Sequence, residues 1–344
     1  MYATIASWSL HGVFRGVLRS ILQIWRTTSH HGMTKPITPA LVDKLYAMLS
    51  PCRLCPRECR VDRLHGELGS CKAGPTLTIS SYHQHFGEEP PLVGRHGSGT
   101  IFLTHCNLHC VFCQNYDISQ RGMGHETTPH ECSRMMLRLQ ALGCHNINFV
   151  TPTPWVPHLV EALRIAQDEG LHIPIVYNCG GYESVETLQL LEGIVAIYMP
   201  DIKYADDACA KKYSDAPHYW DVVRKALKEM HRQVGDLVLE RGIAQRGLLI
   251  RHLVMPGNIA GSKACFAFIR KELSKNTVVN VMAQYYPTHQ AHTYPEINRR
   301  ITAQEYRDAL AELERCGLVE GFRQTMDTIV REIVPEWTDE LREV

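Results

Sequence analysis

The chain has 344 residues, and 36 Lys and Arg balance 36 Asp and Glu, so its formal net charge at pH 7 is zero. A balanced charge gives no electrostatic footprint for nucleic acid or an anionic membrane, and neither is predicted as a partner. The length suits one α/β domain of barrel size or two smaller domains, and 44% hydrophobic residues suit an ordinary globular core.

Residues 1–32 differ from the rest of the chain. Residues 5–26 mix apolar side chains with arginines, and no acidic residue precedes Asp43. The apolar run is interrupted too often to span a bilayer, which needs about 20 apolar residues. The pattern is typical of a transit peptide or a surface helix. We favour the alternative that Met33 is the true start, and in either case we exclude this segment from the fold.

A short helix is expected from Pro39, because Thr38 suits the N-cap and proline suits the first helical position. Pro51 ends this helix, and four cysteines then follow within 20 residues. They are Cys52, Cys55, Cys59 and Cys71. Four cysteines could complete a tetrahedral zinc site or a second iron–sulfur cluster, and the alternative is a set of reduced thiols in a loop. We favour a metal site, although the spacing does not separate zinc from iron.

Thirteen cysteines are many for an intracellular enzyme, and seven of them fall into two tight groups, at 52–71 and 106–113. A secreted disulfide scaffold would be short and rich in cysteine throughout. Clustered cysteines in a long α/β chain instead indicate metal binding in a reducing compartment. We therefore predict a cytoplasmic protein that is best handled without oxygen.

Glu88 and Glu89 lie between the two cysteine groups, in a stretch rich in glycine and proline. Tandem glycines before a strand allow close approach of the backbone. We interpret the two glutamates as a solvated acidic turn, and the alternative is that they face the active site.

The second cysteine group follows the apolar run 100–104 and has the spacing C-x3-C-x2-C. Its members are Cys106, Cys110 and Cys113. A fully ligated four-iron cluster needs four thiolates, so three imply one iron without a protein ligand. Such an iron can bind a substrate or cofactor, as a catalytic zinc does at its open position. A zinc site with a distant fourth ligand, or buried structural thiols, are the alternatives.

From residue 100 onward, apolar strand patterns alternate with helical patterns. The strands are expected at 100–104, 146–150, 173–178, 194–199, 248–254 and 278–284. Capping boxes at Thr128 and Thr302 open two of the helices. This alternation predicts βαβ units with a parallel sheet that is buried on both faces. Six units are fewer than the eight of a closed barrel, so we predict a partial (βα)6 TIM-like barrel with a C-terminal helix.

Polar residues stand where these strands end, which is where parallel α/β folds place their chemistry. They are Asn178, Asp201, Lys203 and Arg251. Asp201 and Lys203 lie two residues apart and so share one side of a strand, either as a structural ion pair or as ligands. Arg251 suits a carboxylate ligand, and a salt bridge at the rim is its alternative. Asn178 precedes two glycines and could also be only a turn signal.

The spacing at 106–113, with Phe112 before the third cysteine, resembles the signature of radical S-adenosylmethionine (SAM) enzymes. The chain is most similar to the PflX group, which is related to the activating enzymes of glycyl radical enzymes such as pyruvate formate-lyase. The matching stretches are 52–59, 87–90, 97–102, 106–115, 145–153 and 246–257. The resemblance runs from about residue 40 to 330, and its motifs are specific for radical SAM chemistry but not for a substrate.

The resemblance implies a radical SAM core at 96–290, after a Cys-rich region at 33–95 and before an extension at 291–344. Cys106, Cys110 and Cys113 would ligate a [4Fe–4S] cluster, while Asn115, Asn178, Asp201, Lys203 and Arg251 would lie near SAM. One departure is that the activases have a Gly-Gly-Glu stretch after the second strand, where this chain has Thr151-Pro152-Thr153.

The implied activity is reductive cleavage of SAM to a 5′-deoxyadenosyl radical, which abstracts hydrogen from a glycyl radical enzyme. The implied partners are that enzyme and a flavodoxin- or ferredoxin-type electron donor. Direct modification of a small molecule or another macromolecule is the first alternative. The second alternative is a non-catalytic electron carrier, although a carrier would need a fourth cysteine in the 106–113 group.

Overall fold

The computed structural model describes residues 32–324. The predicted N-terminal segment 1–32 therefore lies almost wholly outside the described residues, as does the end of the predicted extension 291–344. Among the described helices, none has the length and apolar character that a bilayer crossing requires.

Six parallel strands form the centre of one sheet and follow one another in chain order. They are β2 (Ser98–Leu103), β4 (Ile147–Val150), β5 (Ile175–Cys179), β6 (Ile197–Pro200), β8 (Ile243–Leu253) and β9 (Val278–Met282). All residues of β2, β5 and β6 are buried, as expected for strands covered on both faces.

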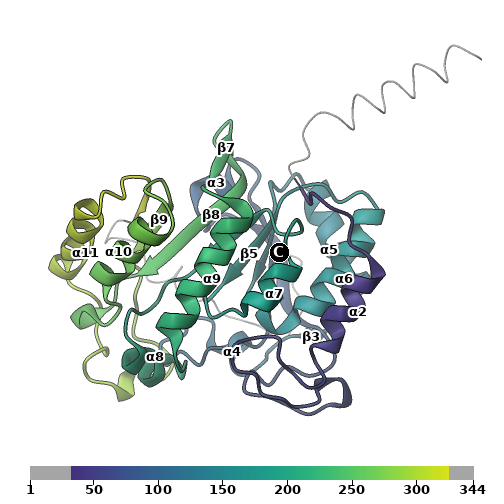
Figure 1. The fold of residues 1–344 in the computed structure, drawn as a ribbon, viewed down its shortest axis with the longest axis horizontal. Coiled ribbons are helices and arrows are strands. Elements are labelled where there is room, and N and C mark those ends of the chain that lie inside the picture. The colour runs from purple at the N-terminus through teal and green to yellow at the C-terminus, as the bar shows by residue number, and fades with distance from the viewer. Residues whose placement is uncertain (1–31, 325–344) are drawn as a thin grey trace, which may run out of the picture.

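A helix follows each of the six strands and covers the sheet (Figure 1). These helices are α5 (Pro129–Ala141), α6 (Val156–Asp168), α7 (Val185–Leu190), α9 (Tyr219–Val234), α10 (Ser262–Glu272) and α11 (Ala303–Arg315). The predicted capping boxes form at Thr128 and Thr302, where each threonine and a glutamate three residues later satisfy backbone N–H groups at the helix start.

Within residues 32–324 the sheet does not close, because its outer strands β10 (Gly321–Arg323) and β3 (His125–Glu126) each have only one neighbour there. Strand β10 pairs in parallel with β9, while β3 pairs with β1 (Thr78–His85), which runs antiparallel to β2. Six βα units in an open sheet confirm the predicted partial barrel of the α/β class.

Several short elements were not predicted. They are α3 (Pro90–Val93), α4 (Tyr116–Ser119), α8 (Asp207–Ser214), β7 (Val238–Glu240) and the three strands β1, β3 and β10. Strand β1 escaped prediction because its sequence Thr-Ile-Ser-Ser-Tyr-His-Gln-His lacks an apolar alternation, and its pairing with β2 holds it in place.

The cysteine-rich N-terminal region packs against α6 and α7. Helix α2 (Pro39–Ala47) is capped by Thr38 as predicted, and Tyr46 just inside its end donates a hydrogen bond of 2.6 Å to Glu161 of α6. The Thr187 hydroxyl on α7 donates to the Leu54 carbonyl oxygen at 2.7 Å. These contacts fix the first cysteine group to the barrel.

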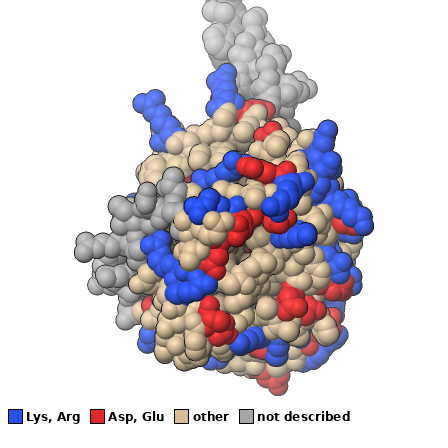
Figure 2. Space-filling model, turned by 90° about the vertical axis from the view of Figure 1, so that its left-hand side faces the viewer, with Lys and Arg blue, Asp and Glu red and all other residues tan. Residues whose placement is uncertain are grey.

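On the face in Figure 2, basic and acidic side chains are interspersed.

Candidate functional site

A cavity of about 660 Å³ opens where the parallel strands end, which is the expected position for a site in such a fold. This volume is typical of pockets that take a drug-sized ligand. Five of the parallel strands contribute to its wall through Phe102, Val150, Asn178, Arg251 and Met282, and β1 contributes His85. Asp201 and Lys203 just after β6, and Asn115 at the N-cap of α4, also line it, so the structure brings together the polar residues singled out in the sequence.

Two members of the second cysteine group, Cys110 and Cys113, line this cavity. The Cys110 Sγ atom accepts a hydrogen bond from the Ser214 hydroxyl at 3.0 Å, and the Cys113 Sγ atom lies 3.2 Å from the Ser119 Oγ atom. The Cys106 Sγ atom accepts from a backbone N–H of its own loop at 3.4 Å. All three sulfur atoms thus have donors that stabilise negative charge.

Burial is the largest influence on these three thiols and raises the pKa of each. The pKa of Cys113 is raised to about 11, and the neighbouring Cys110 thiol adds to the increase. The pKa of Cys110 is also raised by burial, although the Lys203 ammonium opposes the increase. The thiols are therefore protonated at neutral pH unless a metal takes the place of the protons.

These residues fit a [4Fe–4S] cluster with one open iron. They offer three soft thiolate ligands, hydrogen-bond donors to sulfur and a nearby ammonium group. Within residues 32–324, no three His, Cys, Asp or Glu side chains are arranged to hold a single metal ion. A cluster is larger than a single ion, and its thiolates bind different irons.

A buried network of charges forms another part of the cavity wall. Asp201 contacts the Lys203 ammonium at 2.5 Å and the Arg251 guanidinium at 2.8 Å. Burial alone would raise the pKa of Asp201, but Arg251 and Lys203 hold the pKa below its ordinary value. Arg251 also donates to the Asn178 side-chain oxygen at 2.7 Å, so Asn178 is a member of the network and not merely a turn residue.

The interpretation of Glu88 and Glu89 as a solvated turn is wrong. The Glu88 side chain is 9% exposed, lies 3.6 Å from Arg251 and accepts a hydrogen bond from Asn148 at 3.0 Å. Glu89 is 5% exposed and accepts from Asn280. Asn148 on β4 and Arg251 on β8 hold Glu88 at the cavity. Because both partners are distant in the chain, the sequence around Glu88 did not indicate that it is buried. Burial raises the pKa of Glu88 to about 7, and the adjacent Glu89 adds to this while Arg251 opposes it.

None of the residues Thr151, Pro152 and Thr153 is among those that line the large cavity. The Thr153 hydroxyl donates a 2.7 Å hydrogen bond to Glu183, which also accepts from Tyr177 at 3.1 Å. Thr153 lines a second, smaller pocket and not the large cavity. Glu88, and not a residue of this stretch, is a carboxylate that lines the large cavity.

Replacing Glu183 with glutamine is expected to remove a pH dependence of stability. Burial raises the pKa of Glu183 to about 7 from its ordinary value of 4.5, so the folded state holds a proton that the unfolded state releases. The free energy of unfolding of the wild type should fall between pH 4.5 and about 7, by about 3 kcal/mol relative to the variant. Urea unfolding of the metal-free protein across this range measures the difference.

The same replacement at Glu186 is the control, because its side chain is 54% exposed. Parallel pH curves for wild type and the Glu183 variant would contradict the expectation.

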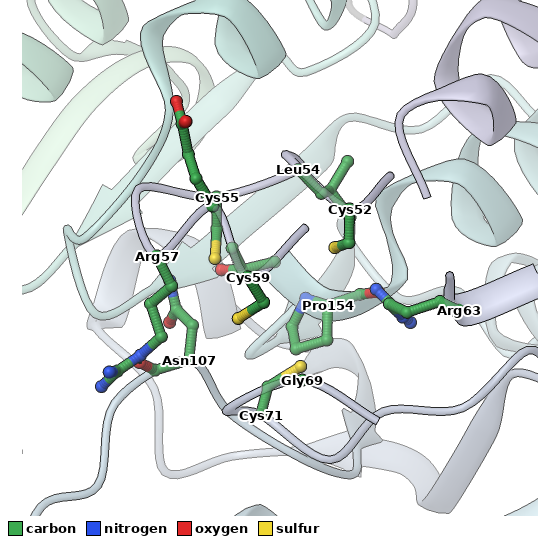
Figure 3. A pocket seen from close by; sticks show the side chains of 12 residues that line it. Cys52, Leu54, Cys55, Arg57, Cys59, Arg63, Gly69, Cys71, Asn107 and Pro154 are labelled. Atoms are coloured by element: carbon green, nitrogen blue, oxygen red, sulfur yellow. The ribbon is translucent and has the colours of Figure 1, made fainter. Parts of the chain in front are cut away.

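The first cysteine group surrounds the smaller pocket (Figure 3). The sulfur atoms of Cys52, Cys55, Cys59 and Cys71 turn toward the same space beside Pro154. All four are free thiols, and burial raises the pKa of Cys55 to about 12. The sequence grouped these residues correctly but did not identify Arg57, Arg63 and Asn107, which share the pocket with them.

Comparisons with known proteins identify the superfamily of the chain. Residues 100–257 match the profile of the radical SAM superfamily. The chain is 36% identical over 275 residues to the uncharacterized protein MJ0674 of Methanocaldococcus jannaschii, a match that covers 78% of this chain and 75% of the relative.

Among solved structures, a domain of a pyruvate-formate lyase-activating enzyme from Bacteroides vulgatus is 12% identical. It covers 49% of this chain and 91% of its own, with a TM-score of 0.35. TYW1 with a lysine-pyruvate adduct is 10% identical and covers 90% of this chain and 93% of its own, with a TM-score of 0.44. From the family profile and the archaeal relative, we conclude that the chain belongs to the radical SAM superfamily, whose enzymes use a [4Fe–4S] cluster and S-adenosylmethionine.

Proposed function

We propose that Cys106, Cys110 and Cys113 hold the [4Fe–4S] cluster and that the large cavity binds SAM and a substrate. With both bound, the cluster and SAM supply a 5′-deoxyadenosyl radical that abstracts a hydrogen atom from the substrate. The observation that carries this proposal is that Cys110 and Cys113 line the same cavity as a network of both charge signs.

The charged wall suits the amino acid part of SAM, which carries an ammonium and a carboxylate. Arg251 is an always-charged fork that matches a carboxylate, and Lys203 adds a second positive charge. Glu88 and Asp201 provide acceptors for the ammonium group. Because Arg251 already contacts both acids, the wall is held in place before SAM binds, which lowers the cost of ordering it.

The substrate that we favour is a backbone glycine of a glycyl radical enzyme. The support is the resemblance of the stretches 52–59, 106–115 and 246–257 to the PflX group and its activase relatives. A flavodoxin- or ferredoxin-type protein would provide the electron, and the cytoplasm is the compartment that suits exposed iron–sulfur chemistry. Direct modification of a small molecule is the second candidate, because the cavity has a volume typical of small-molecule sites.

The test is to rebuild the cluster without oxygen, reduce it with dithionite, add SAM and measure 5′-deoxyadenosine by chromatography. Electron paramagnetic resonance of the reduced protein should change when SAM is added. With a candidate glycyl radical enzyme present, the activase function predicts a protein-centred glycyl radical signal. The proposal would be ruled out if the electron paramagnetic resonance signal does not change when SAM is added and no 5′-deoxyadenosine is formed.

A further inference from the structure

The first cysteine group presents four thiols to one enclosed space that the large cavity does not include. Cys52, Cys55, Cys59 and Cys71 all line the smaller pocket, and Figure 3 shows their sulfur atoms directed into it. No disulfide joins them. Four soft ligands around one space are the donor set of a structural zinc ion or of a fully ligated iron–sulfur cluster.

Arg63 provides an independent reason to expect an anionic group in this pocket. Its side chain lines the pocket and the residue is 1% exposed. The guanidinium donates to the carbonyl oxygens of Pro154 at 2.9 Å and Gly74 at 3.1 Å, and it lies over the Trp155 ring.

Among residues 32–324, Arg63 lacks a hydrogen-bond acceptor for one of its nitrogen atoms and a carboxylate for its charge. Its Nε atom is buried and has no hydrogen-bond partner, and no carboxylate of residues 32–324 forms a salt bridge with it. A buried charge without a partner is costly, so a counter-charge is needed. A metal centre held by four thiolates carries net negative charge and would provide it.

The arrangement favours a cluster over zinc. Zinc draws four thiolates to about 2.3 Å from one ion, which requires them to lie close together. No such arrangement for a single ion occurs in the described part of the chain. The same holds for Cys106, Cys110 and Cys113, the set that fits the cluster common to the superfamily. The first group therefore resembles the group that fits a cluster and lacks the geometry of a preformed zinc site.

The segment that forms the smaller pocket contacts the loop of the second cysteine group. Arg57, between Cys55 and Cys59 in the chain, donates a 2.5 Å hydrogen bond to the carbonyl oxygen of Asn107, the residue after Cys106. Ser70, next to Cys71, lies 3.1 Å from the His109 ring of the same loop. The two cysteine groups therefore share one packed interface.

We infer that Cys52, Cys55, Cys59 and Cys71 bind a second [4Fe–4S] cluster, with Arg63 as its buried counter-charge. Four protein ligands leave no iron open, so this centre differs from the SAM-binding one in kind. The inference concerns metal content and does not depend on the proposed function.

The experiment compares anaerobically rebuilt full-length variants by iron, sulfide and zinc analysis. Wild type should hold about eight irons per chain, as two clusters of four. The variants Cys52→Ala/Cys55→Ala and Cys106→Ala/Cys110→Ala/Cys113→Ala should each hold about half of that iron. Cys209→Ala/Cys316→Ala, which changes two half-buried cysteines outside both groups, should keep the full content.

Two further measurements keep the test decisive if the double variant folds poorly. The triple variant, which would retain only the second cluster, should still show an iron–sulfur spectrum. In that background Arg63→Met should shift the cluster's reduction potential to a more negative value, and Arg63→Lys should restore most of it.

Zinc in place of iron, or a triple variant without a cluster, would overturn the inference. Formation of 5′-deoxyadenosine is assayed separately on the double variant with dithionite as reductant. Wild type that holds only about four irons and still forms 5′-deoxyadenosine would overturn this inference alone, whereas wild type that holds about eight irons and forms none would overturn the proposed function alone.

Discussion

Replacing Cys110 with alanine is expected to abolish formation of 5′-deoxyadenosine, by at least about 10³-fold, and to remove the cluster at this site. Cys110 is 8% exposed, and its sulfur atom accepts a hydrogen bond from the Ser214 hydroxyl. The positive charge of Lys203 also lowers the pKa of the Cys110 thiol. Two remaining thiolates cannot hold a four-iron cluster that already lacks one protein ligand. Iron analysis, electron paramagnetic resonance and product chromatography on the anaerobic protein measure the effect.

Cys132→Ala is the matched control, because Cys132 is fully buried in α5 and belongs to neither cysteine group. It should reduce stability by the loss of packing but keep the iron content and the product. A Cys110 variant that cleaves SAM at the wild-type rate would show that the cluster is held elsewhere.

The fold could be predicted from the sequence because its central strands carry their own signal. The runs near 147–150, 175–179 and 278–282 are apolar and bounded by helix caps, and burial on both faces demands such runs. Strand β1 could not be predicted in this way, because it is held by its partner β2 and not by its own pattern.

The residues of the site also differ in whether the sequence could predict their position. Residues that follow a strand, such as Asp201 and Arg251, could be placed at the cavity, since the ends of parallel strands meet at one edge. Glu88 could not, because its position depends on contacts with Asn148 and Arg251, which are 60 and more residues away in the chain. Ser214 was missed for the same reason, because it contacts Cys110 from a distant segment. Arg63 lies within the stretch of the first cysteine group, but its burial depends on a contact with Pro154, which is far away in the chain.

Replacing Asp201 with asparagine is expected to destabilise the protein by about 3–5 kcal/mol, because it leaves buried positive charges without their main partner. The Lys203 side chain is 15% exposed and that of Arg251 is 17% exposed, so water cannot replace the carboxylate. Of the two, only Arg251 retains another acid, Glu88 at 3.6 Å. Urea unfolding of the metal-free variant and wild type measures the change.

Asp221→Asn is the surface control, because Asp221 is 51% exposed and contacts Lys225 at 2.7 Å in the same kind of ion pair. Exposed pairs contribute at most about 1 kcal/mol, so this variant should stay near wild type. Adding Lys203→Met to Asp201→Asn removes one of the stranded charges and should recover part of the loss, since contacting residues do not act additively. Equal effects of the two aspartate replacements would mean that the Asp201 network is solvated in solution, and a preformed charged wall for SAM would then have no basis.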